Sequence, residues 1–259
     1  MVRTVTATRY VTPLREGGSL PAIVEADDDG LYVLKFRGAG QGHRALVAEL
    51  VVGELARAAG LPVPEIVFVQ LDPILGRSEP DGEIQALVTA SGGLNLALDY
   101  LPGALEFNPL TTAVDRGLAS AIVWFDAFVT NVDRTARNPN MLIWHKQLYL
   151  IDHGAALYFH HHWIDALERS RSPFPQIKDH VLLPRADALE EADITLSASL
   201  TPEVVQDAVS LIPDEWLGDE PDVGGAEAHR AAYVAYLLSR LQSPRAFVEE
   251  AMNARARLV

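Results

Sequence analysis

Residues 124–154 read WFDAFVTNVDRTARNPNMLIWHKQLYLIDHG, and the rest of the chain is organised around this stretch. An apolar run with helical spacing ends in Asn-Val-Asp-Arg at residues 131–134. A polar loop with two asparagines follows, and then two short β-like runs, 141–144 and 148–151, separated by a turn. Short apolar runs on either side of a polar turn are typical of a β-hairpin. The stretch therefore predicts a helix, a loop and a hairpin.

Polar side chains stand at the ends of these predicted elements. Asp133 follows the helix, Asn138 and Asn140 lie in the loop, and Asp152 follows the second strand. Enzymes that transfer phosphoryl groups use such a set, with one aspartate near the attacking hydroxyl and an asparagine and a second aspartate on the metal ion. The pattern therefore favours phosphoryl transfer.

Composition narrows the class of protein. The chain has 259 residues, of which 49% are hydrophobic and 22% charged, as is usual for a globular protein. A net charge of -14 repels nucleic acid and anionic membranes, so we expect neither as a direct partner. The absence of cysteine excludes disulfides and thiolate metal sites. With no signal-peptide pattern and no membrane-spanning apolar run, we expect a cytoplasmic protein.

The N-terminal residues predict a hairpin that contains one lysine. Residues 21–26 and 31–36 read as strands around a turn that ends in Asp-Gly, which is a strong hairpin signal. Lys35 lies in the second strand. It is either an edge lysine with its head in solvent or a lysine that meets the phosphates of a nucleotide. Ahead of the hairpin, the run Gly17-Gly18-Ser19 is either a flexible turn or a set of backbone N–H donors for phosphates.

Residues 43–59 have helical spacing and end at a glycine followed by Leu-Pro-Val-Pro, which is a helix stop. Glu49 falls beside the apolar stripe of this helix, where a carboxylate needs a partner, and Lys35 is a candidate. Residues 65–71 and 83–89 read as further strands. These elements predict an N-terminal nucleotide-binding lobe, residues 1–91, with a small antiparallel sheet and one helix.

The second predicted lobe, residues 92–259, is mainly helical and catalytic. Helical spacing recurs at residues 114–129, 201–211, 226–241 and 244–256. The fold class is therefore α+β, and a ligand is expected in the cleft between the lobes.

The ordered set of motifs resembles the HipA-like kinases, a branch of the protein-kinase-like superfamily that also includes the phosphatidylinositol kinases. The motifs are the glycine-rich turn, YVLKF, VAELVVGELARAAGLPVPE, NVDRTARNPNML and LIDHG, and the resemblance covers roughly residues 13–160. It implies a bilobal protein-kinase-like fold that uses ATP and Mg²⁺.

The resemblance also implies roles for individual residues. Lys35 is similar to the lysine that contacts the α- and β-phosphates, and Glu49 to its ion-pair partner. Asp133 resembles the catalytic-loop aspartate, and Asp152 the metal-binding aspartate of Asp-Phe-Gly, although His153 replaces the phenylalanine. Gly17, Gly18 and Ser19 correspond to the nucleotide-binding loop.

The resemblance leaves the metal-binding asparagine open. The usual spacing from Asp133 selects Asn138, whereas an asparagine directly ahead of a strand selects Asn140, which we favour because a residue at a strand entrance is better fixed. The loop also lacks the lysine or histidine that many kinases carry near the catalytic aspartate, and Arg134 or Arg137 is a candidate for that charge.

Two other functions fit parts of the sequence. A nucleotide-binding pseudokinase or adaptor would keep the fold without the activity. A metal-dependent hydrolase would use His153, His160, His161, His162 and Asp152. Consecutive histidines cannot all face one metal ion, however, and no His-x-x-x-His or His-Glu-x-x-His spacing supports a zinc site. The phosphate acceptor, a protein hydroxyl or a small-molecule alcohol, is not identified. HipA-like kinases are noted for phosphorylating a serine in their own glycine-rich loop, which here would be Ser19.

Overall fold

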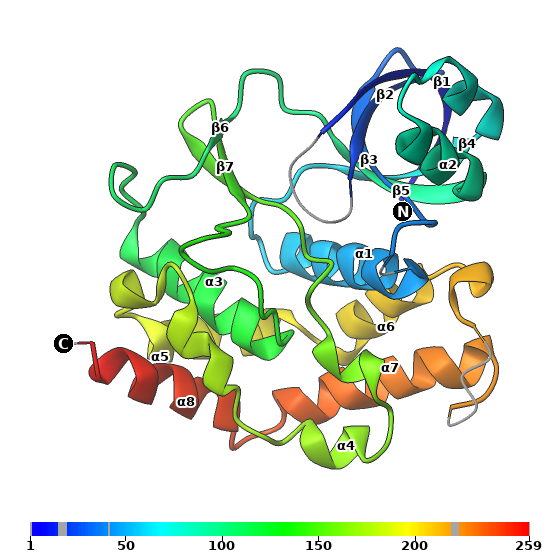
Figure 1. Ribbon diagram of the computed structural model, residues 1–259. Coiled ribbons are helices and arrows are strands. Elements are labelled where there is room, and N and C mark those ends of the chain that lie inside the picture. Colours follow the sequence, from blue (N-terminus) through cyan, green and yellow to red (C-terminus); the bar gives the residue numbers. More distant parts are fainter. Residues whose placement is uncertain (1, 15–19, 41, 219–222, 259) are drawn as a thin grey trace.

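The computed structural model describes residues 2–14, 20–40, 42–218 and 223–258. Gly17, Gly18 and Ser19, which the sequence assigns to the phosphate-binding turn, lie outside the described residues. The fold is mixed α+β, with a sheet-rich N-terminal part and a helical C-terminal part (Figure 1).

The N-terminal part is a closed five-stranded barrel. Its strands are β1 (Thr4–Pro13), β2 (Ala22–Ala26), β3 (Leu31–Lys35), β4 (Ile66–Leu71) and β5 (Gly93–Asp99), in the order β1-β2-β3-β5-β4. The predicted hairpin of β2 and β3 is confirmed, and Asp29 has a φ of 61° in its turn. Alternate residues of β2 and β3 point into the barrel, where Val24 and Leu34 are fully buried.

The sequence predicted an antiparallel sheet, and one pair of strands corrects this. The first residues of β1 pair with β4 in parallel, whereas its later residues pair with β2 antiparallel. Between Ala7 and Thr12 the register shifts twice. Irregularities of this kind bend a strand and increase its twist, so one long strand serves two neighbours and closes the barrel.

A second correction concerns residues 83–89, which were predicted to be a strand. They belong to helix α2 (Gly82–Ala90), which follows the short 3-10 helix η1 (Pro73–Ser78). The side chain of Asp81 accepts a hydrogen bond from the backbone N–H of Glu83, and this cap begins the helix. The strand in this region is β5, which begins after residue 91 and pairs with β3 and β4. The first sheet therefore continues to Asp99.

Helix α1 (Gly42–Ala58) lies between the barrel and the C-terminal helices (Figure 1). Its buried residues, among them Leu50, Val51 and Leu55, join the hydrophobic core of the C-terminal part and not the separate core inside the barrel. The helix ends as predicted at Gly60, whose φ of 77° suits a residue without a side chain.

The C-terminal part contains a three-stranded sheet of β6 (Leu105–Glu106), β7 (Met141–Trp144) and β8 (Gln147–Leu150). The described residues of this part also form helices α3 (Arg116–Phe128), α4 (Ala166–Arg169), α5 (Leu189–Ser199), α6 (Pro202–Ser210), α7 (Ala226–Leu241) and α8 (Ala246–Ala256). The four predicted helices correspond to α3, α6, α7 and α8. The same residues include the short 3-10 helices η2 (Tyr158–His161), η3 (Pro175–Asp179), η4 (Leu183–Arg185) and η5 (Asp214–Trp216).

Candidate active site

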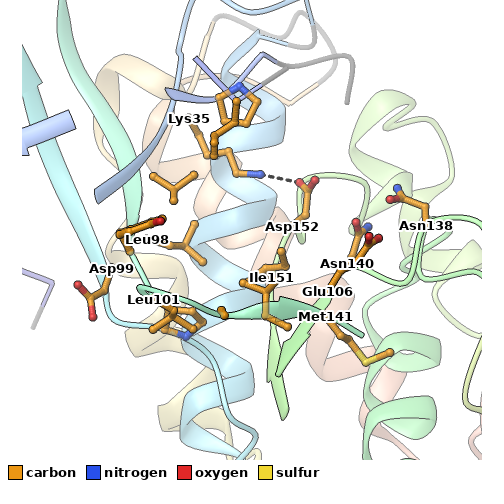
Figure 2. A pocket seen from close by; sticks show the side chains of 17 residues that line it. Lys35, Leu98, Asp99, Leu101, Glu106, Asn138, Asn140, Met141, Ile151 and Asp152 are labelled. Carbon is orange, nitrogen blue, oxygen red and sulfur yellow. Dashed lines mark hydrogen bonds and ion pairs between the residues drawn. The ribbon is translucent and has the colours of Figure 1, made fainter. Parts of the chain in front are cut away.

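A cavity of about 610 Å³ lies where the barrel meets the β6-β7-β8 sheet (Figure 2). The barrel contributes Lys35 and Leu98, and the sheet and its flanking loops contribute Met141, Ile151 and Asp152. Asn138 and Asn140 also line it, so four of the residues singled out in the sequence meet in one space.

Lys35 ends β3 and points across the cavity to Asp152 (Figure 2). Its Nζ atom lies 2.7 Å from Oδ1 of Asp152 and 3.8 Å from Oε2 of Glu49. Burial by itself would lower the pKa of Lys35, but the charges of Glu49 and Asp152 together raise it above its usual value. Lys35 therefore stays protonated, and the reading of an edge lysine in solvent is wrong.

Glu49 is the buried partner in this group, with 2% of its side chain exposed. Burial by itself would raise its pKa, but Lys35 and then His153 lower the pKa of Glu49 to about 2. The carboxylate is therefore charged at neutral pH, and the predicted pairing of Glu49 with Lys35 is present as an ion pair at 3.8 Å.

Asp152 and Gly154 bring the loop after β8 against helix α1. Asp152 has a φ of 56°, a left-handed conformation that aspartate tolerates better than most residues. The backbone N–H of the preceding residue, Ile151, donates to the carbonyl of Asn140 at 3.0 Å. A Cβ atom on Gly154 would lie 3.6 Å from Cβ of Ala45 and 3.7 Å from Oε2 of Glu49, so this loop packs directly on the helix.

Asp133 and the two asparagines form a second group. The side-chain amides of Asn138 and Asn140 both donate to Oδ2 of Asp133, at 2.6 and 3.2 Å. Oδ1 of Asp133 has no hydrogen bond within the described part of the chain. Both asparagines also line the cavity, so the choice between them stays a prediction.

The group that holds this loop in place centres on Asp126 of α3 and was not predicted from the sequence. Its carboxylate accepts hydrogen bonds from Asn131 at 3.0 Å and from Arg134 at 2.6 Å, and it lies 2.9 Å from Nε2 of His180. Burial by itself would raise the pKa of Asp126, but the Arg134 charge and His180 lower it below its usual value. The signal for it was a single aspartate inside the apolar run WFDAF.

Arg134 has a different role from the one suggested by the sequence. Its side chain is 0% exposed, and besides Asp126 it donates to the carbonyls of Asn140 and, at 3.4 Å, Ile151. The Asp126 carboxylate therefore neutralises the charge of Arg134 inside the protein, and the hydrogen bonds of Arg134 join the loop between α3 and β7 to the hairpin. Arg137 is exposed.

The histidines after Gly154 lie in the helical part. Nδ1 of His160 is 3.0 Å from the hydroxyl of Tyr233 on α7, and burial lowers the pKa of His160 well below its usual value. Within the described ranges, no group of three or more His, Cys, Asp or Glu side chains is placed to hold a metal ion. In the same ranges, none of the helices has the length and apolar character needed to cross a membrane.

Comparisons with known proteins found a matching family and similar solved structures. The sequence model of the family described as HipA-like kinase matches residues 8–250. The crystal structure of the Helicobacter pylori proinflammatory kinase CtkA superposes with a TM-score of 0.60 and 13% identity, covering 100% of this chain and 99% of that one. The Golgi casein kinase with Mn/ADP bound gives a TM-score of 0.46 and 14% identity, covering 95% and 74%. No curated protein matches the chain.

Proposed function

This chain belongs to the HipA-like kinase family and is a phosphotransferase, and we propose that it moves the γ-phosphate of ATP, with Mg²⁺, to a hydroxyl group of a protein or small molecule. The observation that carries the proposal is the meeting of Lys35, Asp152 and the two asparagines bonded to Asp133 around one cavity. Positioned charges of this kind are what phosphoryl transfer requires.

We propose that the barrel and the helical part are the two lobes of a kinase fold, divided after Asp99 rather than at residue 91. The nucleotide then lies between them. Apolar side chains on both sides of the cavity, among them Val33, Leu98 and Met141, would cover the base. Leu14 and Pro21, which lie before and after Gly17, Gly18 and Ser19 in the chain, also line the cavity.

Lys35 would bind the phosphates, and Glu49 would hold Lys35 for that purpose. In the structure Lys35 is already charged and bonded to Asp152. A protein with a net charge of -14 needs such a local positive group to accept a polyanion.

The oxygen atoms beside Lys35 fit a magnesium ion. Asp152 offers a carboxylate and Asn140 an amide oxygen, with Asn138 as the alternative, and these are ligands that Mg²⁺ takes together with phosphates and water. When bound, the ion would neutralise charge on the phosphates. Asn140 directly precedes β7, and its backbone carbonyl accepts hydrogen bonds from Arg134 and Ile151. These bonds fix its position, which favours Asn140 over the exposed Asn138.

Asp133 would orient the acceptor hydroxyl and take its proton. The two asparagine amides hold Oδ2, so Oδ1 is left to face the acceptor. Phosphoryl transfer then needs no covalent intermediate on the protein, because positioning and charge neutralisation supply most of the catalysis.

A γ-labelled ATP assay tests the proposal, with the purified protein alone and with cell lysate. Protein and small-molecule products are measured separately, which identifies the acceptor class. Asn138→Ala and Asn140→Ala are compared in the same assay, and we expect the larger loss at Asn140. Nucleotide binding without any transfer would instead favour a pseudokinase.

A further inference from the structure

His153 is a buried histidine whose ring has no hydrogen bond. Its side chain is 0% exposed, and neither Nδ1 nor Nε2 has a hydrogen-bond partner among the described residues. A neutral imidazole carries one N–H donor and one acceptor, and leaving these unpaired inside a protein costs free energy. Because His153 directly follows Asp152, we looked for a group that its ring could bind.

An unpaired acceptor close to the His153 ring belongs to Glu49. Its two carboxylate oxygens face different groups, because Oε2 lies 3.8 Å from Nζ of Lys35 while Oε1 lies 3.6 Å from Nδ1 of His153. Oε1 also lacks a hydrogen bond among the described residues. The separation is slightly longer than a hydrogen bond, and a small rotation of either side chain closes it.

Lys35 leaves room for a second contact of Glu49. Its Nζ atom lies closer to Asp152, at 2.7 Å, than to Glu49, at 3.8 Å. Against the effect of burial, both the ring and the backbone of His153 help Lys35 to lower the pKa of Glu49. His153 follows Asp152 in the chain, and Gly154 packs on α1 beside Glu49. Asp152, Lys35, Glu49 and His153 thus form a closed circuit between β3, α1 and the loop after β8.

We propose that His153 is a positioning residue that donates Nδ1–H to Oε1 of Glu49 and thereby holds the carboxylate, and through it Lys35, in register with Asp152. The proposal rests on the proposed function, since it assigns Lys35 to the phosphates. Phenylalanine, which the Asp-Phe-Gly pattern places here, has no N–H on its side chain and could not donate such a bond. In this chain a polar bond joins α1 to the metal-binding loop instead.

The kinetic test compares His153→Phe with His153→Asn, whose amide N–H stands near the Nδ1 position. We expect His153→Phe to lower kcat about ten- to a hundredfold, with a smaller change in KM for ATP, because a hydrogen bond to a charged group is lost. His153→Asn should stay within about threefold of the wild type. A purely structural histidine would instead make both variants equally poor or leave both active.

A double-mutant cycle then identifies the partner. In a Glu49→Gln background, His153→Phe should lower kcat by less than about twofold further, because the contact is already weakened. Glu54→Gln, on the same helix and paired with Arg57, is the matched control in which the full effect of His153→Phe should persist. Equal effects in both backgrounds would overturn the proposal.

A second readout needs neither ATP nor activity. The ¹⁵N resonances of the His153 ring should show the Nδ1–H tautomer in the wild type and should move in Glu49→Gln but not in Glu54→Gln. An Nε2–H tautomer, or a ring unaffected by Glu49→Gln, would refute the bond. If the wild type transfers no phosphate, the proposed function fails, and the ring resonances alone decide whether His153 binds Glu49.

Discussion

At the scale of single residues, Lys35 is held by two carboxylates rather than by one. Its contact with Asp152 is the shorter, and this pair closes the cavity wall where phosphates would lie. If the proposed function holds, a nucleotide with its metal ion would exchange the Lys35–Asp152 bond for new contacts of both residues. Neither residue contributes only packing, so their replacement is expected to act on ligand binding more than on folding.

The first prediction follows for nucleotide binding. Asp152→Asn should abolish the Mg²⁺-dependent part of ATP binding, and Lys35→Ala should weaken binding by about tenfold or more, because each removes a charge-assisted contact. Thermal shift with ATP and Mg²⁺ measures this, since a ligand that binds only the folded state raises the melting temperature. Lys178→Ala, an exposed lysine, is the control. Wild-type shifts in both site variants would disprove the assignment.

Asp133 allows catalysis to be separated from binding. Asp133→Asn should lower kcat by about 10²- to 10⁴-fold, the range for loss of a general base, while the Kd for ATP changes little. The reason is that Asp133 is bonded to the two cavity-lining asparagines and not to Lys35, and the proposed function assigns it to the acceptor rather than to the phosphates. Isothermal titration with ATP and the labelled-phosphate assay supply the two quantities. A parallel collapse of affinity would make Asp133 a metal ligand instead.

These residues could be selected from the sequence because their spacing along the chain reports their chemistry. Lys35, Glu49, Asp133 and Asp152 each follow or lie in a strongly patterned segment. Asp126 and His180 could not be found in this way. His180 lies 54 residues from Asp126, and the nearer partners Asn131 and Arg134 follow the helix in a loop, where a buried polar contact leaves no periodic signal. Only the folded structure shows that Asp126 supports the loop between α3 and β7.

At the scale of elements, the structure differs from the sequence-based expectation in two neighbouring segments. Helix α2 was predicted to be a strand, and strand β5 was not predicted. The segment of α2 has the cap Asp81 and few charges, so its short apolar run also fits a strand. The segment of β5 begins at Gly93, whose φ of 103° suits glycine, and Gly92-Gly93 resembles a linker. Pairing with β3 and β4 decides its conformation, and this is tertiary information.

The loop between α3 and β7 depends on the Asp126 group, and a third prediction tests it. Asp126→Asn should lower the free energy of unfolding by about 3–5 kcal/mol, because Arg134 is left as a buried, unpaired charge. The same change at the exposed Asp179 should cost less than about 0.5 kcal/mol. Urea unfolding at neutral pH measures both. Equal stabilities of the two variants would show that the buried pair contributes nothing.

The same carboxylate predicts the direction of a pH effect. The pKa of Asp126 is lower in the folded protein than its usual value of 3.8, so its contribution is complete above that pH and is lost as the pH falls further. Glu49, with a folded pKa of about 2 against a usual 4.5, acts in the same sense. The stability difference between wild type and Asp126→Asn should therefore shrink below about pH 4.

A fourth prediction concerns the glycine-rich segment, residues 17–19. Leu14 before this segment and Pro21 after it both line the cavity. Phosphorylation of Ser19 would add about -1.5 to -2 charges near the phosphates of the nucleotide, and the repulsion should weaken ATP binding. We expect phosphate at Ser19 by mass spectrometry after incubation with ATP and Mg²⁺. Ser19→Asp should raise the Kd for ATP, whereas Ser172→Asp, at an exposed serine, should not. Unmodified Ser19 with normal affinity in Ser19→Asp would exclude this switch.

At the scale of the whole molecule, the barrel and the helical part have separate hydrophobic cores, so their relative position depends on what joins them. Helix α1 is one connection, because it packs with the helical core and lies against β4 and β5. The short helix η5 is another. Trp216 of η5 packs edge-on to Phe68 of β4, with ring centroids 5.6 Å apart, and its Nε1–H donates to the carbonyl of Leu94 at 3.4 Å.

The residue beside it, Glu215, makes a different kind of contact with the barrel. Its carboxylate lies 2.7 Å from the Arg37 guanidinium, but the side chain of Arg37 is 22% exposed and that of Glu215 is 47% exposed. Water and salt screen such a pair, and surface ion pairs contribute about 0–1 kcal/mol. Trp216, by contrast, is almost fully buried. Replacing Trp216 therefore tests the apolar contact between η5 and the barrel, and replacing Glu215 tests the ionic contact beside it.

The last prediction uses this difference. Trp216→Ala should lower the free energy of unfolding by about 3–5 kcal/mol, as large-to-small changes of buried aromatic residues do, whereas Glu215→Ala should cost at most about 1 kcal/mol. Hydrogen exchange should become faster in β4 and β5 of Trp216→Ala, because these strands lose the surface that fixes them to the helical part. Since the cavity lies where the barrel meets the β6-β7-β8 sheet, ATP affinity should fall in Trp216→Ala even though Trp216 does not line it. A larger loss of stability in Glu215→Ala would show that the connection is mainly ionic. An equal rise of hydrogen exchange throughout Trp216→Ala would show that η5 does not hold the barrel in place.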